Sequence, residues 1–102
     1  MTRDISSIRF VDASIVRVIE DADHRRLTFD VIYPLTEAGP DFPRGRLVFE
    51  FYSRYLVAES NLPGQPLILA VELVEVGPEE MTLRIRTTRG FREVSCFEVR
   101  CE

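Results

Sequence analysis

Apolar and polar residues alternate along most of this chain, and that alternation constrains the fold more than any other feature. From residue 27 to residue 33 the odd positions are apolar, while Arg26, Thr28 and Asp30 are polar. A two-residue period places the apolar side chains on one face of a β-strand. No segment has the apolar spacing of a long amphipathic helix. The sequence therefore predicts an all-β fold with half-buried strands.

The first two strands are expected to form an antiparallel hairpin. Residues 15–20 are rich in β-branched side chains, and only the polar stretch Asp21 to His24 separates them from the segment 27–33. Polar residues of this kind suit a tight turn, because their side chains hydrogen-bond to nearby backbone groups. With Glu20 they also form the one cluster of metal-ligating or acid–base residue types. The turn accounts for these residues without a metal or a catalytic role.

Prolines and glycines between residues 34 and 45 predict a long loop between the second and third strands. The third strand is expected from Arg46 to Ala58, either as one long strand or as two strands joined by a bulge. Its odd-numbered residues form the apolar face, so Tyr52 and Arg54 are expected to point outward. The expected inner face consists of Leu47, Phe49, Phe51, Tyr55 and Val57.

Two further strands are expected after the turn signal at residues 61–66, with a connection at residues 77–80. When both apolar faces lie on the same side, Glu72 lies opposite or diagonal to Arg84 and Arg86. The basic run is then either a register device that neutralises the acidic run or a functional surface. The expected apolar faces are Leu67, Leu69, Val71 and Leu73, then Met81, Leu83 and Ile85; the two runs are Glu72, Glu75, Glu79 and Glu80, then Arg84, Arg86, Arg89 and Arg92.

The last segment, Phe91 to Cys101, changes its alternation near Cys96, which predicts a bulge or a barrel corner there. About six short antiparallel strands result, and they fit either a small β-barrel or a β-sandwich. The segment Asp4 to Val11 is compatible with a single helical turn capped by Asp4 or with a lead into the first strand. The 102 residues are expected to form a single all-β domain, 1–102.

The residue inventory excludes several classes of function. The chain contains no lysine, so pyridoxal chemistry and the P-loop lysine are excluded. One histidine and two cysteines make a zinc site improbable, and Cys96 and Cys101 point to opposite faces of the expected strand, too far apart to pair. Neither a phosphate-binding glycine loop nor a nucleophile elbow occurs. We therefore expect no enzyme, no metal and no cofactor.

Charge and hydropathy restrict the partners. The formal net charge of −4 disfavours nucleic acid, because the overall field repels phosphate. No apolar run is long enough to cross a membrane, and the amino terminus lacks the apolar run of a secretory signal. We expect a cytoplasmic protein with another protein as its partner.

Four residues are the expected binding candidates. Tyr52 and Arg54 are predicted to point outward together, and tyrosine and arginine are enriched where proteins bind each other. Arg84 and Arg86 are added from the basic run, if that run does more than fix the register. An isolated exposed tyrosine is also ordinary surface, so both interpretations of Tyr52 stay open.

Two segments resemble short bacterial all-β proteins that include immunity-type domains of polymorphic toxin systems. The first is Phe10-Val11-Asp12-Ala13-Ser14-Ile15, followed by the hairpin from Val18 to Val31. The second is Arg89-Gly90-Phe91 with Ser95-Cys96-Phe97-Glu98. The resemblance implies a cytoplasmic protein that neutralises a partner and has no catalysis of its own.

Two functional hypotheses follow. The first is a bacterial, non-enzymatic β-domain that binds another protein and can form a homodimer through an uncovered edge strand. The second is a small β-barrel that holds a small-molecule ligand among its aromatic residues. They differ in what they require of Leu47, Phe49, Phe51 and Tyr55, which fill the interior in the first case and line a cavity in the second.

Overall fold

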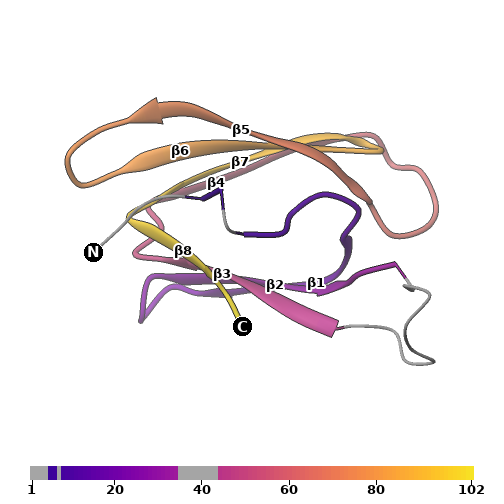
Figure 1. Ribbon diagram of the computed structural model, residues 1–102, viewed down its shortest axis with the longest axis horizontal. Coiled ribbons are helices and arrows are strands. Elements are labelled where there is room, and N and C mark those ends of the chain that lie inside the picture. Colours follow the sequence, from indigo (N-terminus) through magenta and orange to yellow (C-terminus); the bar gives the residue numbers. More distant parts are fainter. Residues whose placement is uncertain (1–4, 7, 35–43) are drawn as a thin grey trace.

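Eight antiparallel strands make up most of the described chain (Figure 1). A computed structural model describes residues 5–6, 8–34 and 44–102, and these residues contain no helix. No helix of this part is therefore a candidate membrane span. The strands are β1 (Ser14–Asp21), β2 (Arg26–Ile32), β3 (Arg44–Glu50), β4 (Arg54–Glu59), β5 (Ile68–Val76), β6 (Met81–Thr87), β7 (Gly90–Cys96) and β8 (Glu98–Cys101).

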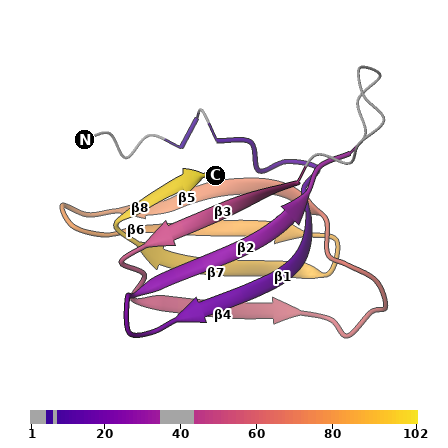
Figure 2. The ribbon, with the colours of Figure 1, turned by 90° about the horizontal axis from the view of Figure 1, so that it is seen from below.

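The strands form two four-stranded sheets that face each other (Figures 1 and 2). Sheet A has the order β1-β2-β3-β8, and sheet B has the order β4-β7-β6-β5. The all-β prediction is confirmed, and the structure has two sheets in place of a closed barrel. Eight strands replace the six expected, because the segments 46–58 and 91–101 each cross from one sheet to the other and divide there.

The first of these crossings is a bulge at Phe51. Glu50 pairs with Arg26, and the amide of Tyr52 donates to the carbonyl of Arg25 at 3.0 Å, so Phe51 is an extra residue in its strand. Its φ of 54° lies in the left-handed region, which glycine favours and a bulky residue rarely adopts. The amide of Phe97 donates to the carbonyl of Glu50 at 3.0 Å, which places the second crossing beside the first.

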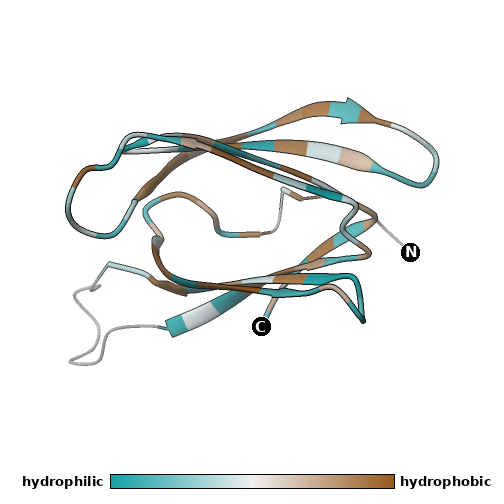
Figure 3. Cartoon of the chain, turned by 180° about the vertical axis from the view of Figure 1, so that it is seen from behind, coloured by the Kyte–Doolittle hydropathy of each residue, from teal (hydrophilic) through white to brown (hydrophobic). Residues whose placement is uncertain are grey.

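The core lies between the two sheets. The predicted inner face of β2 is confirmed, as are those of β6 and of the first half of β3. The ring of Phe29 meets those of Phe49 and Tyr55, with centroid distances of 5.0 and 5.8 Å. Figure 3 shows apolar residues alternating with polar ones along strands of both sheets. The largest fully buried side chains are Leu27, Phe29, Val31, Leu47, Phe49, Ile68, Met81, Leu83, Ile85, Val94 and Cys96.

The bulge overturns the predicted orientation of two residues, Phe51 and Tyr52. Phe51 was expected inside and is 54% exposed, whereas Tyr52 was expected outside and packs against the core. The extra residue reverses the alternation locally, which explains both errors. The predicted alternation resumes in β4, where Arg54 is exposed and Tyr55 packs against the core. Val57 does lie opposite the buried Arg92, but β4 is an edge strand and leaves half of this side chain exposed.

The predicted inner face of β5 is wrong at its start. Ile68 is fully buried and Leu69 is exposed, the reverse of the expected parity. The pairing with β6 shifts register between Ile68 and Ala70, so an inward orientation resumes at Val71, opposite Ile85. A second shift between Leu73 and Glu75 interrupts the alternation again.

Some predictions concern residues that are not among those described. Residues 35–43 of the loop predicted from Pro34 to Gly45 lie outside the described residues. β3 begins at Arg44, two residues before the expected start. Asp4 also lies outside, so its capping role stays a prediction. Cys96 is buried and Cys101 is exposed, and no disulfide joins them.

Candidate functional site

Three of the four predicted binding residues lie on the outer face of sheet B. Arg54 on β4 pairs with Ser95, whose other neighbour is Thr82 on β6. Arg84 and Arg86 follow on the same face of β6. Tyr52 does not join them: it precedes β4 at the crossing, and its hydroxyl contacts Glu20 at 3.4 Å.

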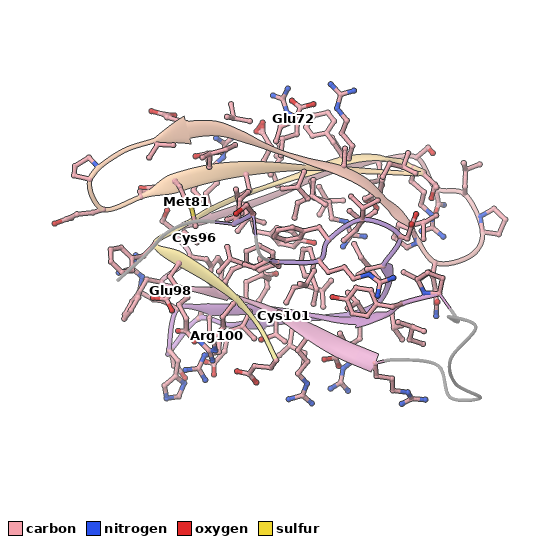
Figure 4. The ribbon with its side chains drawn as sticks, in the orientation of Figure 1. Glu72, Met81, Cys96, Glu98, Arg100 and Cys101 are labelled. Atoms are coloured by element: carbon pink, nitrogen blue, oxygen red, sulfur yellow. The ribbon has the colours of Figure 1, made fainter. Side chains whose placement is uncertain are left out.

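Ion pairs with neighbouring strands account for the positions of Arg84 and Arg86. Glu72 lies directly opposite Arg84, one of the predicted arrangements, and its carboxylate forms an ion pair with Arg86 at 2.9 Å. Arg84 turns to the other side, where it contacts Glu93 at 3.1 Å and lies over the ring of Phe91. Figure 4 shows Glu72 on the outer surface of β5, directed away from sheet A. These pairs support the register role that the sequence left open for Arg84 and Arg86.

Arg92 has a different environment, which the sequence analysis missed. It points between the sheets, and its guanidinium donates to both oxygens of Glu59 at 2.7 and 2.9 Å. It also donates to the hydroxyl of Tyr55 at 3.0 Å, and Thr87 donates to Glu59 at 2.9 Å. Parity with Val94 was the signal that could have placed Arg92 inside.

The buried pair shifts the ionisation of its members. Burial raises the pKa of Glu59, but hydrogen bonds from Arg92 and Thr87 outweigh it and hold that pKa below its usual value. Burial raises the pKa of Tyr55. This buried, hydrogen-bonded ion pair is a structural element of the fold. Removing either Glu59 or Arg92 alone would leave the charge of the other uncompensated inside.

The free edge of β5 carries several exposed aliphatic side chains. Beyond Ile68, no described strand pairs with the side of β5 that faces away from β6; the contact with β1 is limited to the bridge between Ser14 and Leu67 and its adjoining hydrogen bonds. Figures 1 and 2 show the β5–β6 hairpin extending beyond sheet A. We name Leu69, Leu73, Val74 and Val76, which are 45–64% exposed, the β5 edge patch.

Carboxylates accompany the β5 edge patch. Glu75 lies between Val74 and Val76, and the following turn carries Glu79 and Glu80. All three are exposed. Glu80 accepts a hydrogen bond from the hydroxyl of Ser53 at 2.8 Å, which ties the turn to the β3–β4 crossing. An apolar edge with an acidic end is a surface for a partner that is apolar and basic.

A pocket of about 350 Å³ opens beside that turn. The rings of Phe51 and Phe97 meet there edge to face, with centroids 6.2 Å apart. The bulge that exposes Phe51 also brings its ring to that of Phe97. This pair could not be predicted from the sequence, because Phe51 continues the odd-numbered apolar row of Leu47 and Phe49. We name it the corner pocket; its lining is Arg25, Phe51, Ser53, Glu79, Glu80 and Phe97.

A second hollow, about 660 Å³ in volume, lies on the outer face of sheet A. Three arginines line it, and two of them hold Asp30: Arg17 contacts this carboxylate at 3.2 Å and Arg46 at 3.1 Å. It adjoins Arg44, the first residue after the segment outside the description. Charge pairing across neighbouring strands explains the two contacts with Asp30.

Of the four residues that the ligand-barrel hypothesis places around a cavity, Phe51 lines the corner pocket, and Leu47, Phe49 and Tyr55 line neither hollow. Leu47 and Phe49 are fully buried, and Phe49 packs against Phe29. At the tip of the β1–β2 hairpin, Asp21 accepts from the amide of His24 at 3.2 Å and contacts its ring nitrogen at 2.8 Å. Among the described residues, no group of three or more histidine, cysteine, aspartate or glutamate side chains is placed to hold a metal ion.

Comparison with known proteins identifies the fold alone. No family model and no curated protein matches the chain. An uncharacterized protein from Neisseria gonorrhoeae has a similar structure, with a TM-score of 0.63 and 15% sequence identity. The match covers 92% of this chain and 93% of the other. The likeness shows that the two chains share an all-β fold.

Proposed function

We propose that this chain is a non-enzymatic, cytoplasmic protein-binding domain that recognises its partner along the free edge of β5. One observation carries the proposal: the β5 edge patch leaves four large aliphatic side chains exposed on a strand with open hydrogen-bonding groups. An unpaired edge strand is a template for the addition of a strand from another chain.

The chemistry of the edge favours a basic partner. Glu72 is already paired with Arg86, but Glu75, Glu79 and Glu80 add acidic charge at the end of the strand. The formal net charge of −4 acts in the same direction, because complementary charge speeds encounter. An extended segment that alternates apolar and basic residues fits this edge. An immunity-type role, in which the domain neutralises a basic toxin, is compatible with this chemistry.

A second copy of the chain is the alternative partner at the β5 edge. Homodimerisation would add the same strand to itself, but it would bring acidic residues of both copies toward each other. Like charges directly opposite each other in a sheet are destabilising. We therefore favour a different protein over a homodimer.

The packing of the interior gives the ligand-barrel alternative no comparable support. Leu47, Phe49, Phe51 and Tyr55 would have to line its cavity. Leu47 and Phe49 are fully buried, and Tyr55 packs against Phe29 and hydrogen-bonds to Arg92. Phe51 is exposed at the surface, in the corner pocket, and not inside the fold.

The test is affinity capture from a lysate of the source organism with matched edge variants. Val74→Lys places a charge on the β5 edge, and Val57→Lys places the same charge on the edge strand β4 as the control. We expect a stoichiometric partner to be retained by the wild type and by V57K and lost by V74K, with all three proteins folded by circular dichroism. Equal recovery of the partner with V74K would reject this edge as the binding surface.

Light scattering on the free protein separates the two occupants. A monomer that forms a complex with the captured partner supports the proposal. A wild-type homodimer that V74K dissociates would replace the basic partner with a second copy of the chain.

A further inference from the structure

The corner pocket brings together four connections that are far apart in the sequence. Arg25 ends the β1–β2 turn, Phe51 and Ser53 belong to the β3–β4 crossing, Glu79 and Glu80 form the β5–β6 turn, and Phe97 is the β7–β8 crossing. Connections held on a rigid sheet framework are the usual position of binding residues. The hydrogen bond from Ser53 to Glu80 fixes two of these connections to each other.

Backbone strain is concentrated in the same place. Phe51 and Arg25 both have positive φ, of 54° and 52°, and their backbones are joined through the amide of Tyr52. Glycine would occupy either position without steric cost. A phenylalanine in this conformation opposes local preference, and residues held in this way cluster at functional sites. The strain has a visible result: the ring of Phe51 stands exposed against that of Phe97.

The charge around the two rings is acidic. Glu79 and Glu80 supply two carboxylates and Arg25 supplies one guanidinium, so the lining has a net charge of −1. Aromatic faces attract cations through the ring quadrupole, and carboxylates accept the hydrogen bonds of a guanidinium. For an anion, the lining offers one charged partner, the guanidinium of Arg25.

We propose that the corner pocket binds an arginine side chain of the protein partner, with the guanidinium against the rings of Phe51 and Phe97 and within reach of Glu79. Arginine is favoured over lysine because its planar group stacks on aromatic rings and pairs with carboxylates in a fixed geometry. Only the origin of this arginine in the partner rests on the proposed function. The preference of the pocket for a guanidinium stands on the pocket alone.

The test uses N-acetyl-arginine amide as the probe, added to the full chain at constant ionic strength. Aromatic and amide NMR signals report where it binds, and N-acetyl-lysine amide and N-acetyl-norleucine amide serve as comparison probes. We expect saturable shifts confined to the corner pocket, stronger with the arginine probe than with lysine and absent with norleucine. Non-saturable shifts, or shifts spread over the whole surface, would overturn the proposal.

Two variants remove the recognition groups without disturbing the core. Phe51→Gly suits the positive φ and should fold normally, and Glu79→Gln removes one carboxylate. We expect each to weaken probe binding about threefold or more. Glu102→Gln makes the same chemical change outside the pocket and should leave probe binding unchanged. Wild-type affinity in F51G would overturn the proposal.

For a third variant we expect stronger probe binding. Arg25→Asn removes the competing cation, and asparagine tolerates a positive φ. The net charge of the lining becomes −2, so probe binding should strengthen about twofold or more. Weaker binding in R25N would show that Arg25 serves a bound group of the opposite charge, and would overturn the assignment.

The proposals for the corner pocket and for the β5 edge can be rejected independently of each other. Capture of a partner that depends on Val74, without any binding of the arginine probe, would overturn the pocket and leave the edge intact. Binding of the probe that depends on Phe51, with no capture of a partner, would support the pocket and reject the edge.

Discussion

β2 and β5 both carry large apolar side chains, but most of those of β2 are buried and most of those of β5 are exposed. β2 runs between β1 and β3, and sheet B covers its inner face, so Leu27 and Phe29 are fully buried. β5 is the edge of sheet B, and its hairpin extends beyond sheet A (Figure 1), so Leu73 stays exposed although it lies opposite the buried Leu83. Burial therefore depends on what covers a strand, and an uncovered apolar strand is available to a partner.

The largest expected effect comes from the covered side. Phe29→Ala removes a fully buried ring that packs against Phe49 and Tyr55. We expect a loss of about 3–5 kcal/mol in the free energy of unfolding, because the substitution leaves a cavity. Urea denaturation followed by circular dichroism measures it. A loss of about 1 kcal/mol or less would remove the contrast with β5.

The two ion pairs extend the comparison to charge. Glu59→Gln leaves the buried guanidinium of Arg92 without its counter-charge, whereas Glu72→Gln affects a pair on the open face of β5. We expect a loss of about 3 kcal/mol for E59Q and of about 0.5 kcal/mol or less for E72Q. Denaturation of both variants beside the wild type checks this. The double variant Arg92→Met, Glu59→Met should recover much of the stability that E59Q loses.

The buried pair also predicts a pH dependence. The pKa of Glu59 is lower in the folded chain than its usual value, so its stabilising contribution is present above the unfolded pKa near 4.5. It is lost as the pH falls through the folded pKa. Denaturation midpoints measured from neutral pH to below pH 4 should fall more steeply for the wild type than for E59Q. Parallel curves would mean that Glu59 does not carry this dependence.

A small effect is also expected when an apolar side chain of the open side is shortened. Leu73→Ala removes an apolar side chain that is already half exposed, so the free energy of unfolding should change by about 1 kcal/mol or less. The same variant should weaken the binding of the captured partner if the β5 edge is the binding surface. A loss as large as that of Phe29→Ala would show that the edge is covered within the monomer.

Period-2 alternation predicted the strands and the core where coverage is complete. Phe29, Phe49 and Leu83 follow it. Parity also placed Glu72 opposite or diagonal to Arg84 and Arg86, and the structure has it opposite Arg84. Parity failed where an extra residue reversed it. Phe51 is the clearest case, because a bulge of this type favours glycine and phenylalanine gives no sign of it.

The candidate sites were less accessible from the sequence. Arg92 shares its parity with Val94 and was thus open to correct placement, but its partner Glu59 is 33 residues away and one sequence does not reveal such a pairing. The corner pocket depends on four connections meeting in space. Coverage of β5 depends on the relative lengths of two sheets, and the alternation within a strand carries no information about that.

The pairing of β8 with β3 joins strands that are far apart in the sequence. The other three strands of sheet A lie within residues 14–50, whereas β8 follows all four strands of sheet B. Sheet A therefore cannot be completed by local contacts alone, and non-local pairing of this kind slows folding. Until β8 has paired, β3 presents an open edge beside Leu47 and Phe49 to which another strand can add.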